Sequence, residues 1–219
     1  MSPVSVKVGG VWKDAPSVYT KVGGDWKTAA DMPVKVGGVW KTGILSSGAF
    51  EPIATATGTG SSSTITFSSI PSTYQHLQIK VLGRTTSTSS LIKPLILWVN
   101  GVNTGTSYAR HLLWGTGSAV SVGGAADQPY WDLADALGTD YYASGLMGVS
   151  IIDIHDYAST SKYKTMRALS GCDTNNTTGK IWLSSGLYKS TSAITSISLN
   201  STNNFTTDST FALYGIKGA

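Results

Sequence analysis

Aspartate and histidine side chains are the residues of this sequence best suited to chemistry. The densest group is Asp153-Ile-His155-Asp156, and its carboxylates are ligands that calcium or another hard cation prefers. On a strand, Asp153 and His155 face one side and Asp156 the other, whereas in a loop all three can converge. The alternative is an ordinary strand end at which aspartates accept hydrogen bonds from turn amides. We favour this alternative and expect no metal and no cofactor.

A second group places carboxylates beside two aromatic rings. Tyr130 and Trp131 have four aspartates around them: Asp127, Asp132, Asp135 and Asp140. A carboxylate pair beside aromatic rings is typical of a glycosidase, but the same spacing fits N-caps and the exposed face of a short helix over residues 131–137. Glu51 is the only glutamate, so a tuned acid and base pair has few candidates. No serine lies in a nucleophile elbow, and we expect that the protein is not an enzyme.

Short β-strands are the elements that must position these residues. Apolar and polar residues alternate with a period of two, which is the strand signal, over about nine segments: 64–67, 76–82, 95–99, 108–113, 143–154, 164–170, 180–188, 194–199 and 210–216. The turn Asn100-Gly101 follows the third of these segments. Apart from the helix over residues 131–137, the sequence therefore predicts an all-β protein, with an antiparallel, jelly-roll-like sandwich over residues 61–219.

Three repeats with a period of 14 residues precede this body. Each contains Lys-Val-Gly-Gly-x-Trp-Lys, beginning at Lys7, Lys21 and Lys35. Two glycines between β-branched and aromatic residues form a two-residue hairpin turn, which in the first repeat pairs Val8 with Val11, Lys7 with Trp12 and Val6 with Lys13. We expect an extended N-terminal arm of three short β-hairpins over residues 1–43. A linker over residues 44–60, with one short strand at residues 50–56, joins it to the body.

The arm is predicted to anchor the protein to other chains. A two-stranded hairpin is at best marginally stable alone, and the repeats carry a large apolar load of tryptophan. The alternative is that the repeats pack on their own chain as edge strands. The anchoring residues we expect are the lysines and tryptophans of the repeats: Lys7, Trp12, Lys13, Lys21, Trp26, Lys27, Lys35, Trp40 and Lys41.

Charge and composition exclude several classes of protein. The chain has 219 residues and a net charge of +4, of which +3 belongs to residues 1–43. Lysines that bracket turns favour edge protection and an acidic protein partner over nucleic acid, so we expect no nucleic-acid binding. The start of the chain lacks a basic segment followed by an apolar run, and no stretch approaches about 20 apolar residues. We therefore expect no signal peptide and no membrane insertion.

Three segments of the body resemble a family of tailed-phage virion proteins, often found in phages of aquatic bacteria. They are Thr64-Ile-Thr-Phe-Ser-Ser-Ile-Pro-Ser-Thr-Tyr-Gln-His-Leu-Gln-Ile-Lys80, Ile152-Asp-Ile-His-Asp-Tyr-Ala-Ser159 and Ser209-Thr-Phe-Ala-Leu-Tyr-Gly-Ile-Lys217. The resemblance covers roughly residues 60–219, and the Tyr-Gly-Ile-Lys ending is its most specific element. The Gly-Gly-x-Trp-Lys repeats resemble short modules at the ends of phage tail and fibre proteins. Relatives often have Asn-Gly-Asp after the third strand, where this chain has Asn100-Gly-Val.

The resemblance implies a structural protein of a virion. A homotrimeric tail fibre or receptor-binding protein is our first interpretation, a capsid decoration or head-fibre protein is the second, and a free-standing carbohydrate-binding module is the third. Partners would be other virion proteins, through the arm, and a host cell-surface glycan. Loops over residues 100–108, 114–130 and 172–178 are the expected recognition surface, although ordinary solvated connections remain the alternative. The candidate glycan-binding residues are Asn103, Tyr108, Trp114, Tyr130 and Trp131.

Overall fold

The computed structural model describes two compact units of the chain, Met1–Gly48 and Ala49–Ala219. In the first unit it describes the backbone of six strands only. In the second unit it describes residues 49–141, 145–174 and 179–218.

Three antiparallel hairpins make up the described part of the first unit. They pair β1 (Val4–Val8) with β2 (Val11–Ala15), β3 (Tyr19–Val22) with β4 (Asp25–Thr28), and β5 (Val34–Val36) with β6 (Val39–Lys41). In the first hairpin Val8 pairs with Val11, Lys7 with Trp12 and Val6 with Lys13, which is the register expected for a Gly-Gly turn. The Gly-Gly pairs themselves and the side chains of the anchoring lysines and tryptophans lie outside the described residues.

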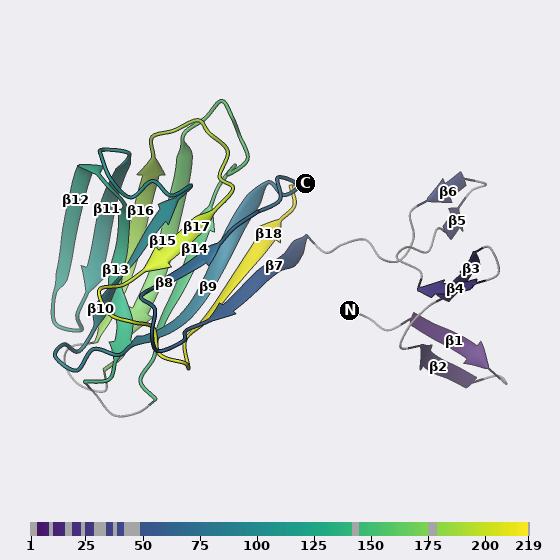
Figure 1. Ribbon diagram of the computed structural model, residues 1–219, viewed down its shortest axis with the longest axis horizontal. Helices are drawn as coiled ribbons and strands as arrows, with labels where there is room; N and C mark the ends of the chain where they lie inside the picture. Colours follow the sequence, from purple (N-terminus) through teal and green to yellow (C-terminus); the bar gives the residue numbers. More distant parts are fainter. Residues whose placement is uncertain are drawn as a thin grey trace. The chain divides into compact units, whose positions relative to one another are not determined.

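The second unit, which we call the body, contains twelve strands. They are β7 (Phe50–Thr57), β8 (Thr64–Phe67), β9 (His76–Thr85), β10 (Lys93–Val99), β11 (Tyr108–Gly115), β12 (Val120–Gln128), β13 (Trp131–Thr139), β14 (Gly148–Ile154), β15 (Lys164–Cys172), β16 (Lys180–Tyr188), β17 (Ile197–Asn200) and β18 (Thr210–Ile216). All twelve belong to one hydrogen-bonded, mostly antiparallel and open sheet (Figure 1). The expected all-β class is therefore confirmed.

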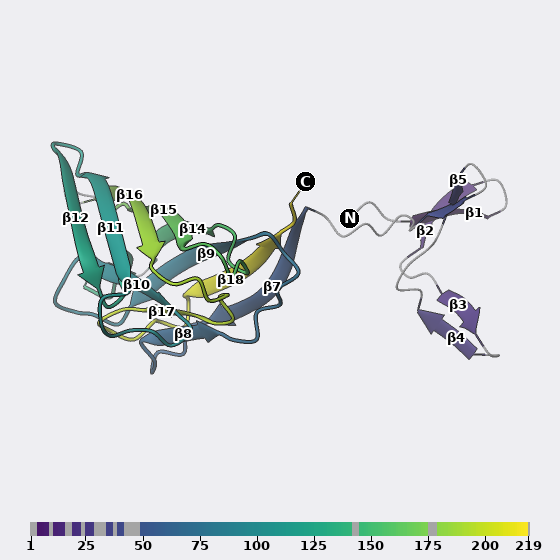
Figure 2. The same ribbon diagram turned by 90° about the horizontal axis from the view of Figure 1, so that it is seen from above.

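This sheet consists of two antiparallel sections that lie against each other. The long section has the strand order β7-β18-β9-β14-β15-β16-β11-β12, and the short section has the order β13-β10-β17-β8. Two parallel residue pairs, Gly138 with Arg84 and Thr139 with Thr85, connect β13 to β9 and join the sections. Figure 2 shows β10, β17 and β8 on one side of the curved long section. We call the face of the long section that covers them its inner face.

The core fills the space between the two sections. Alternate residues of β9 and β10 point into it, and Leu77, Ile79, Leu95 and Leu97 are all fully buried. Such alternation follows from the two-residue repeat of a strand. The indole of Trp131 on β13 packs on Gly186 of β16, where a Cβ atom would lie only 2.6 Å from the ring. A glycine is needed there because the two sections approach closely.

The expected helix over residues 131–137 is wrong, because this segment is strand β13. Its pairing with β10 shifts register at two places, so Leu133 and Ala136 are extra residues on β13. Bulges of this kind interrupt the alternation of faces. The resulting spacing of buried residues, at positions 131, 133, 134, 136 and 137, imitates a helical stripe.

The short strand expected at residues 50–56, within the linker predicted over residues 44–60, is confirmed. Residues 50–57 form β7, which pairs with β18 through seven residue pairs and belongs to the body unit that begins at Ala49.

Strand β12 was not expected, because Gly123, Gly124, Ala125 and Ala126 have low strand propensity. The predicted Asn100-Gly101 turn is confirmed: both residues have positive φ, 52° and 71°, as a tight two-residue hairpin turn requires.

Candidate functional site

Nine exposed aliphatic side chains gather on the outer face of the long section, which faces away from the short section. We call this set the apolar outer face: Leu82, Leu113, Val120, Val122, Val149, Ile151, Leu169, Ile181 and Leu183. Their exposed fractions lie between 39% and 76%. Single exposed aliphatic residues are normal in proteins, but a contiguous group indicates a surface that a partner covers.

Strand register makes this group contiguous. Direct neighbours across five strands form one row: Ile151 on β14, Leu169 on β15, Leu183 on β16, Leu113 on β11 and Val122 on β12. A second row runs through Leu82, Val149, Gly171, Ile181, Gly115 and Val120. Cross-strand neighbours on one face have Cβ atoms about 5 Å apart, so the side chains of the first row touch, while Gly171 and Gly115 interrupt the second.

A shallow depression of about 900 Å³ lies over part of this face. Val149, Ile151, Leu169 and Ile181 line its floor, and the loop at residues 115–118 forms part of its rim. Gly171, in the second row, also lines this depression. Because glycine has no side chain, the surface is lower at that position. All nine residues keep at least 39% of their surface exposed, and contiguous exposed apolar patches mark sites of interaction.

A polar row forms one border of the apolar outer face. Asp153 on β14 accepts hydrogen bonds from Gln78 Nε2 at 2.8 Å and from Arg167 Nε at 2.9 Å. Gln78 and Arg167 are its direct neighbours on β9 and β15. Both carboxylate oxygens of Asp153 therefore accept hydrogen bonds from neighbouring side chains. This polar residue lies where the apolar outer face ends.

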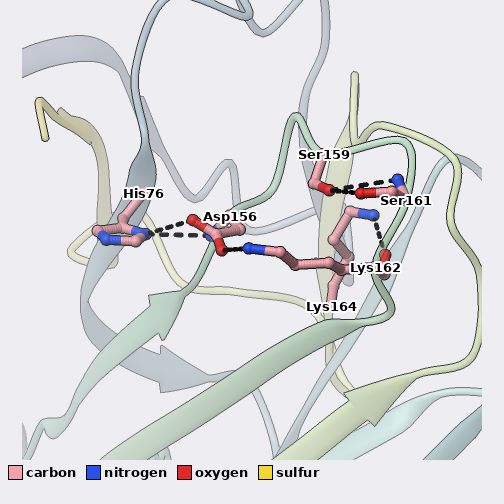
Figure 3. Close-up of polar contacts among 6 residues, drawn as sticks. All are labelled: His76, Asp156, Ser159, Ser161, Lys162 and Lys164. Atoms are coloured by element: carbon pink, nitrogen blue, oxygen red, sulfur yellow. Dashed lines mark hydrogen bonds and ion pairs between the residues drawn. The ribbon is translucent and has the colours of Figure 1, made fainter.

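The turn after β14 separates Asp156 from Asp153. In Figure 3, His76 and Lys162 converge on Asp156: His76 Nδ1 accepts a hydrogen bond from the Asp156 backbone N–H at 3.0 Å, and Lys162 Nζ donates to Oδ2 at 2.7 Å. The hydrogen bond from Lys162 lowers the pKa of Asp156. Within residues 49–141, 145–174 and 179–218, no three His, Cys, Asp or Glu side chains cluster in a way that could hold a metal ion.

The four aspartates around Tyr130 and Trp131 each lie beside a different cation. Asp127 pairs with Lys189, Asp132 with Arg110, Asp135 with Lys180 at 4.0 Å, and Asp140 with Arg84 at 2.9 Å. Asp132 and Asp135 nevertheless border the same cleft. Burial raises the pKa of Asp135, and the nearby ammonium of Lys180 opposes that rise.

Two of the candidate glycan-binding residues are in the core, where a sugar cannot reach them. Tyr108 and Trp131 are fully buried. The Tyr108 hydroxyl accepts a hydrogen bond from the Val99 N–H at 2.9 Å and donates to the Val102 carbonyl at 3.0 Å, which fixes the turn at residues 100–101. Trp131 Nε1 donates to Ser184 Oγ at 3.0 Å. These aromatic rings stabilise the fold. The prediction that Tyr108 and Trp131 bind a glycan is therefore wrong.

The remaining candidates do not meet in one place. Asn103 is exposed, Tyr130 is half-buried, and neither lines the cleft that contains Trp114. This cleft of about 310 Å³ is lined by Arg110, Leu112, Trp114, Gly123, Gly124, Asp132, Ala134, Asp135 and Trp182. Trp114 and Trp182 are direct cross-strand neighbours, and their rings stack with centroids 4.8 Å apart.

The sequence interpretation missed Arg110 and Trp182 as site residues. Trp114 and Trp182 lie 68 positions apart. Trp182 belongs to the strand predicted over residues 180–188, whereas Trp114 belongs to the loop predicted over residues 114–130. Alternation shows which residues of one strand share a face with a tryptophan, namely those two positions away. It does not show that β11 pairs with β16, because the two strands are far apart in the sequence.

Comparison of the chain with protein-family models, with curated proteins and with solved structures found no match. Within the described part of the chain, no helix is long and apolar enough to cross a membrane.

Proposed function

We propose that this protein is a structural protein of a phage virion, a tail fibre or receptor-binding protein, whose body assembles with copies of itself through the apolar outer face. The observation that carries the proposal is the contiguity of nine exposed aliphatic residues over neighbouring strands of one face. A trimer is the expected assembly. The resemblance of residues 60–219 to tailed-phage virion proteins supports the virion as its location.

We also propose that the body is a jelly roll. Two features of its topology support this fold. Successive strands alternate between the two sections: β8, β10, β13 and β17 belong to the short section, and β9, β11 with β12, and β14 to β16 belong to the long one. The order β8-β17-β10-β13 is that of one jelly-roll sheet. The other sheet then carries a three-stranded meander, β14-β15-β16, where a jelly roll has a single strand, and β7 with β18 extends its edge.

A second copy of the chain is the occupant that best fits the apolar outer face. The two rows contain no charged residue, and the polar border of the face contains both an acid and a base, Asp153 and Arg167. Copies of one surface can therefore meet without placing like charges together. The arm repeats of a neighbouring chain, or another virion protein, are the competing occupants.

Light scattering after size-exclusion chromatography tests this assembly. We expect a trimer at micromolar concentration for the full chain and a monomer for Leu183→Asp, because Leu183 lies in the middle of the first row. The matched control is Thr165→Asp, on the same face of β15 outside the apolar rows, which should remain trimeric. Circular dichroism checks that each variant is folded. A monomeric wild type, or an unchanged assembly of folded Leu183→Asp, would overturn the proposal.

The proposed anchoring role of the arm has its own test. Deletion of residues 1–43 leaves β7 intact, so we expect a folded body that no longer incorporates into particles. Deletion of residues 1–60 is the contrast, because it removes β7 and exposes the edge of β18; this variant should be less stable or aggregate. Normal copy number of the shorter deletion in particles would contradict the anchoring role.

Capsid decoration is the second candidate function, because the same apolar outer face could assemble subunits on a capsid. Particles that lack the protein distinguish the two roles. Loss of adsorption to host cells with a stable capsid supports the receptor-binding role, whereas a capsid that opens at lower temperature selects decoration.

A further inference from the structure

We propose that the cleft between β11, β12, β13 and β16 binds one ring of a neutral saccharide. This inference deepens the proposed receptor-binding role and rests on it for the source of the sugar, but the cleft can be tested on the purified protein alone. The cleft lies between β11, β12 and β16 of the long section and β13, the edge strand of the short section. It is separate from the apolar outer face.

The walls of the cleft provide a flat apolar surface. Trp114 stacks on Trp182, and its ring packs closely over Gly123 on β12, where an added Cβ atom would lie only 3.3 Å from it. Indole faces attract the weakly positive C–H groups on the face of a sugar ring, as they attract other positive edges. The volume of about 310 Å³ is at the lower end of the range for small-molecule sites, which suits one ring.

Hydrogen-bonding groups border this apolar wall. Trp182 is only 6% exposed, and its indole Nε1 has no hydrogen-bond partner among the residues that the structure describes. Arg110 Nε is a second buried donor without a partner in the same part of the chain. Unpaired buried donors are costly, and an acceptor oxygen of a ligand would satisfy them. Asp132 and Asp135 supply carboxylates that accept hydrogen bonds from hydroxyl groups.

The charges of the cleft favour a neutral ligand. Arg110 pairs with Asp132, and Lys180 lies 4.0 Å from Asp135 and over the ring of Trp182 at 5.4 Å. Two cations and two carboxylates balance, so neither an anion such as a phosphate nor a cation gains from entering. The cleft thus combines an aromatic wall, hydrogen-bonding groups and balanced charge. A neutral sugar matches this combination, because it has an apolar ring face and hydroxyl groups that both donate and accept hydrogen bonds.

Tryptophan fluorescence and saturation-transfer NMR on the full chain test this site. The probes are glucose, galactose, mannose and N-acetylglucosamine, followed by purified lipopolysaccharide and capsular polysaccharide of the host as two separate arms. We expect millimolar binding of at least one monosaccharide, and tighter binding of the polysaccharide that contains it. The two polysaccharide arms identify the source of the sugar.

Two variants close the cleft in different ways. Trp114→Ala removes an aromatic wall of the cleft, and Gly123→Val places a branched side chain against the Trp114 ring, which must shift to admit it, without removing a polar group; each should weaken binding at least tenfold. The control is Trp98→Ala, which removes a partly buried tryptophan on β10 away from the cleft and should leave binding unchanged. Gly123→Val keeps the test valid if Trp114→Ala does not fold.

The outcomes separate this inference from the proposed function. Absence of binding to every probe, or wild-type binding by folded Gly123→Val, overturns the saccharide site, while the trimer and the arm remain to be judged by their own experiments. Sugar binding that persists in the monomeric Leu183→Asp variant supports the site even if the proposed assembly fails.

Discussion

Both faces of strands β14, β15 and β16 depart from a simple inside-outside rule: the inner face buries hydroxyl groups among apolar core residues such as Ile152 and Met166, and the outer face exposes aliphatic side chains. On the inner face Ser150, Ser170 and Ser184 are buried under the short section. On the outer face Ile151, Leu169 and Leu183 are half-exposed. Buried hydroxyls cost free energy unless they are hydrogen-bonded, and exposed aliphatic side chains gain nothing in the free chain.

Packing within the subunit accounts for the small polar side chains of the inner face, whereas it does not account for the exposed aliphatic side chains of the outer face. Ser184 Oγ accepts the hydrogen bond of Trp131 Nε1, and small side chains leave room for that indole. No described residue of the body covers the first apolar row, so its side chains contribute to the protein only when something else packs on them. The comparison therefore separates residues that stabilise the subunit from residues that we propose to hold subunits together.

The largest expected effect is on the inner face, at Trp131. Trp131→Ala removes a fully buried indole and should lower the free energy of unfolding by about 3–5 kcal/mol. Leu169→Ala on the outer face should lower it by less than about 1 kcal/mol, since half of that side chain is already in water. Urea unfolding in the monomeric Leu183→Asp background measures both. Equal losses at the two positions would contradict the division between the faces.

A pair of serine substitutions on the inner face should act in opposite directions. Ser184→Ala leaves the Trp131 indole N–H unpaired and should cost about 1–3 kcal/mol. Ser170→Ala removes a buried hydroxyl that has no partner in the described part of the chain, and should stabilise the body by about 1 kcal/mol. Thermal unfolding of the two variants is the measurement. A loss of stability in Ser170→Ala would show that its hydroxyl is paired in solution.

A smaller effect concerns pH at the polar turn after β14. Lys162 holds the pKa of Asp156 below its ordinary value, so Asp156 contributes stability above that value and loses the contribution as pH falls through its folded-state pKa. Lys162→Met should raise the pKa of Asp156 and flatten the loss of stability in acid. Carboxyl titration by NMR measures the pKa directly. Lys80→Met, on β9 beside Phe50 and Tyr214, is the control and should leave Asp156 unaffected.

Thiol labelling sharpens the contrast without changing stability greatly. Cys172 is 2% exposed, and burial raises the pKa of its thiol to about 11. Because the thiolate is the reactive form, Ellman's reagent at pH 8 should label it only after unfolding. Leu169→Cys in a Cys172→Ala background places a thiol on the apolar outer face, and we expect fast labelling of the monomer and about tenfold slower labelling of the trimer. Equal rates in both states would place Leu169 outside the interface.

Much of the fold could be predicted from the sequence, because strand formation and tight turns depend on neighbouring residues. Alternation along residues 64–67 and 210–216 predicts strands with the bounds that the structure has. The Asn100-Gly101 turn and the pairing of the first arm hairpin also follow from local geometry. Strand β13 was misread because its two bulges shift the alternation, and bulges are specified by the partner strand β10.

The candidate sites depended on long-range pairing, which the sequence does not show. Alternation in β15 identifies two faces, but the face that is buried contains Lys164 and Ser170, while Leu169 is half-exposed. Which face is covered depends on where the short section packs, and that is decided by strands far away in the sequence. The same holds for the cleft, where Trp114 meets Trp182 only because β11 pairs with β16. The sequence by itself determined most of the strands and the arm hairpins. Only the tertiary structure decided β12, the bulges of β13 and which side chains are exposed or brought together, because burial and juxtaposition arise when distant strands pack together.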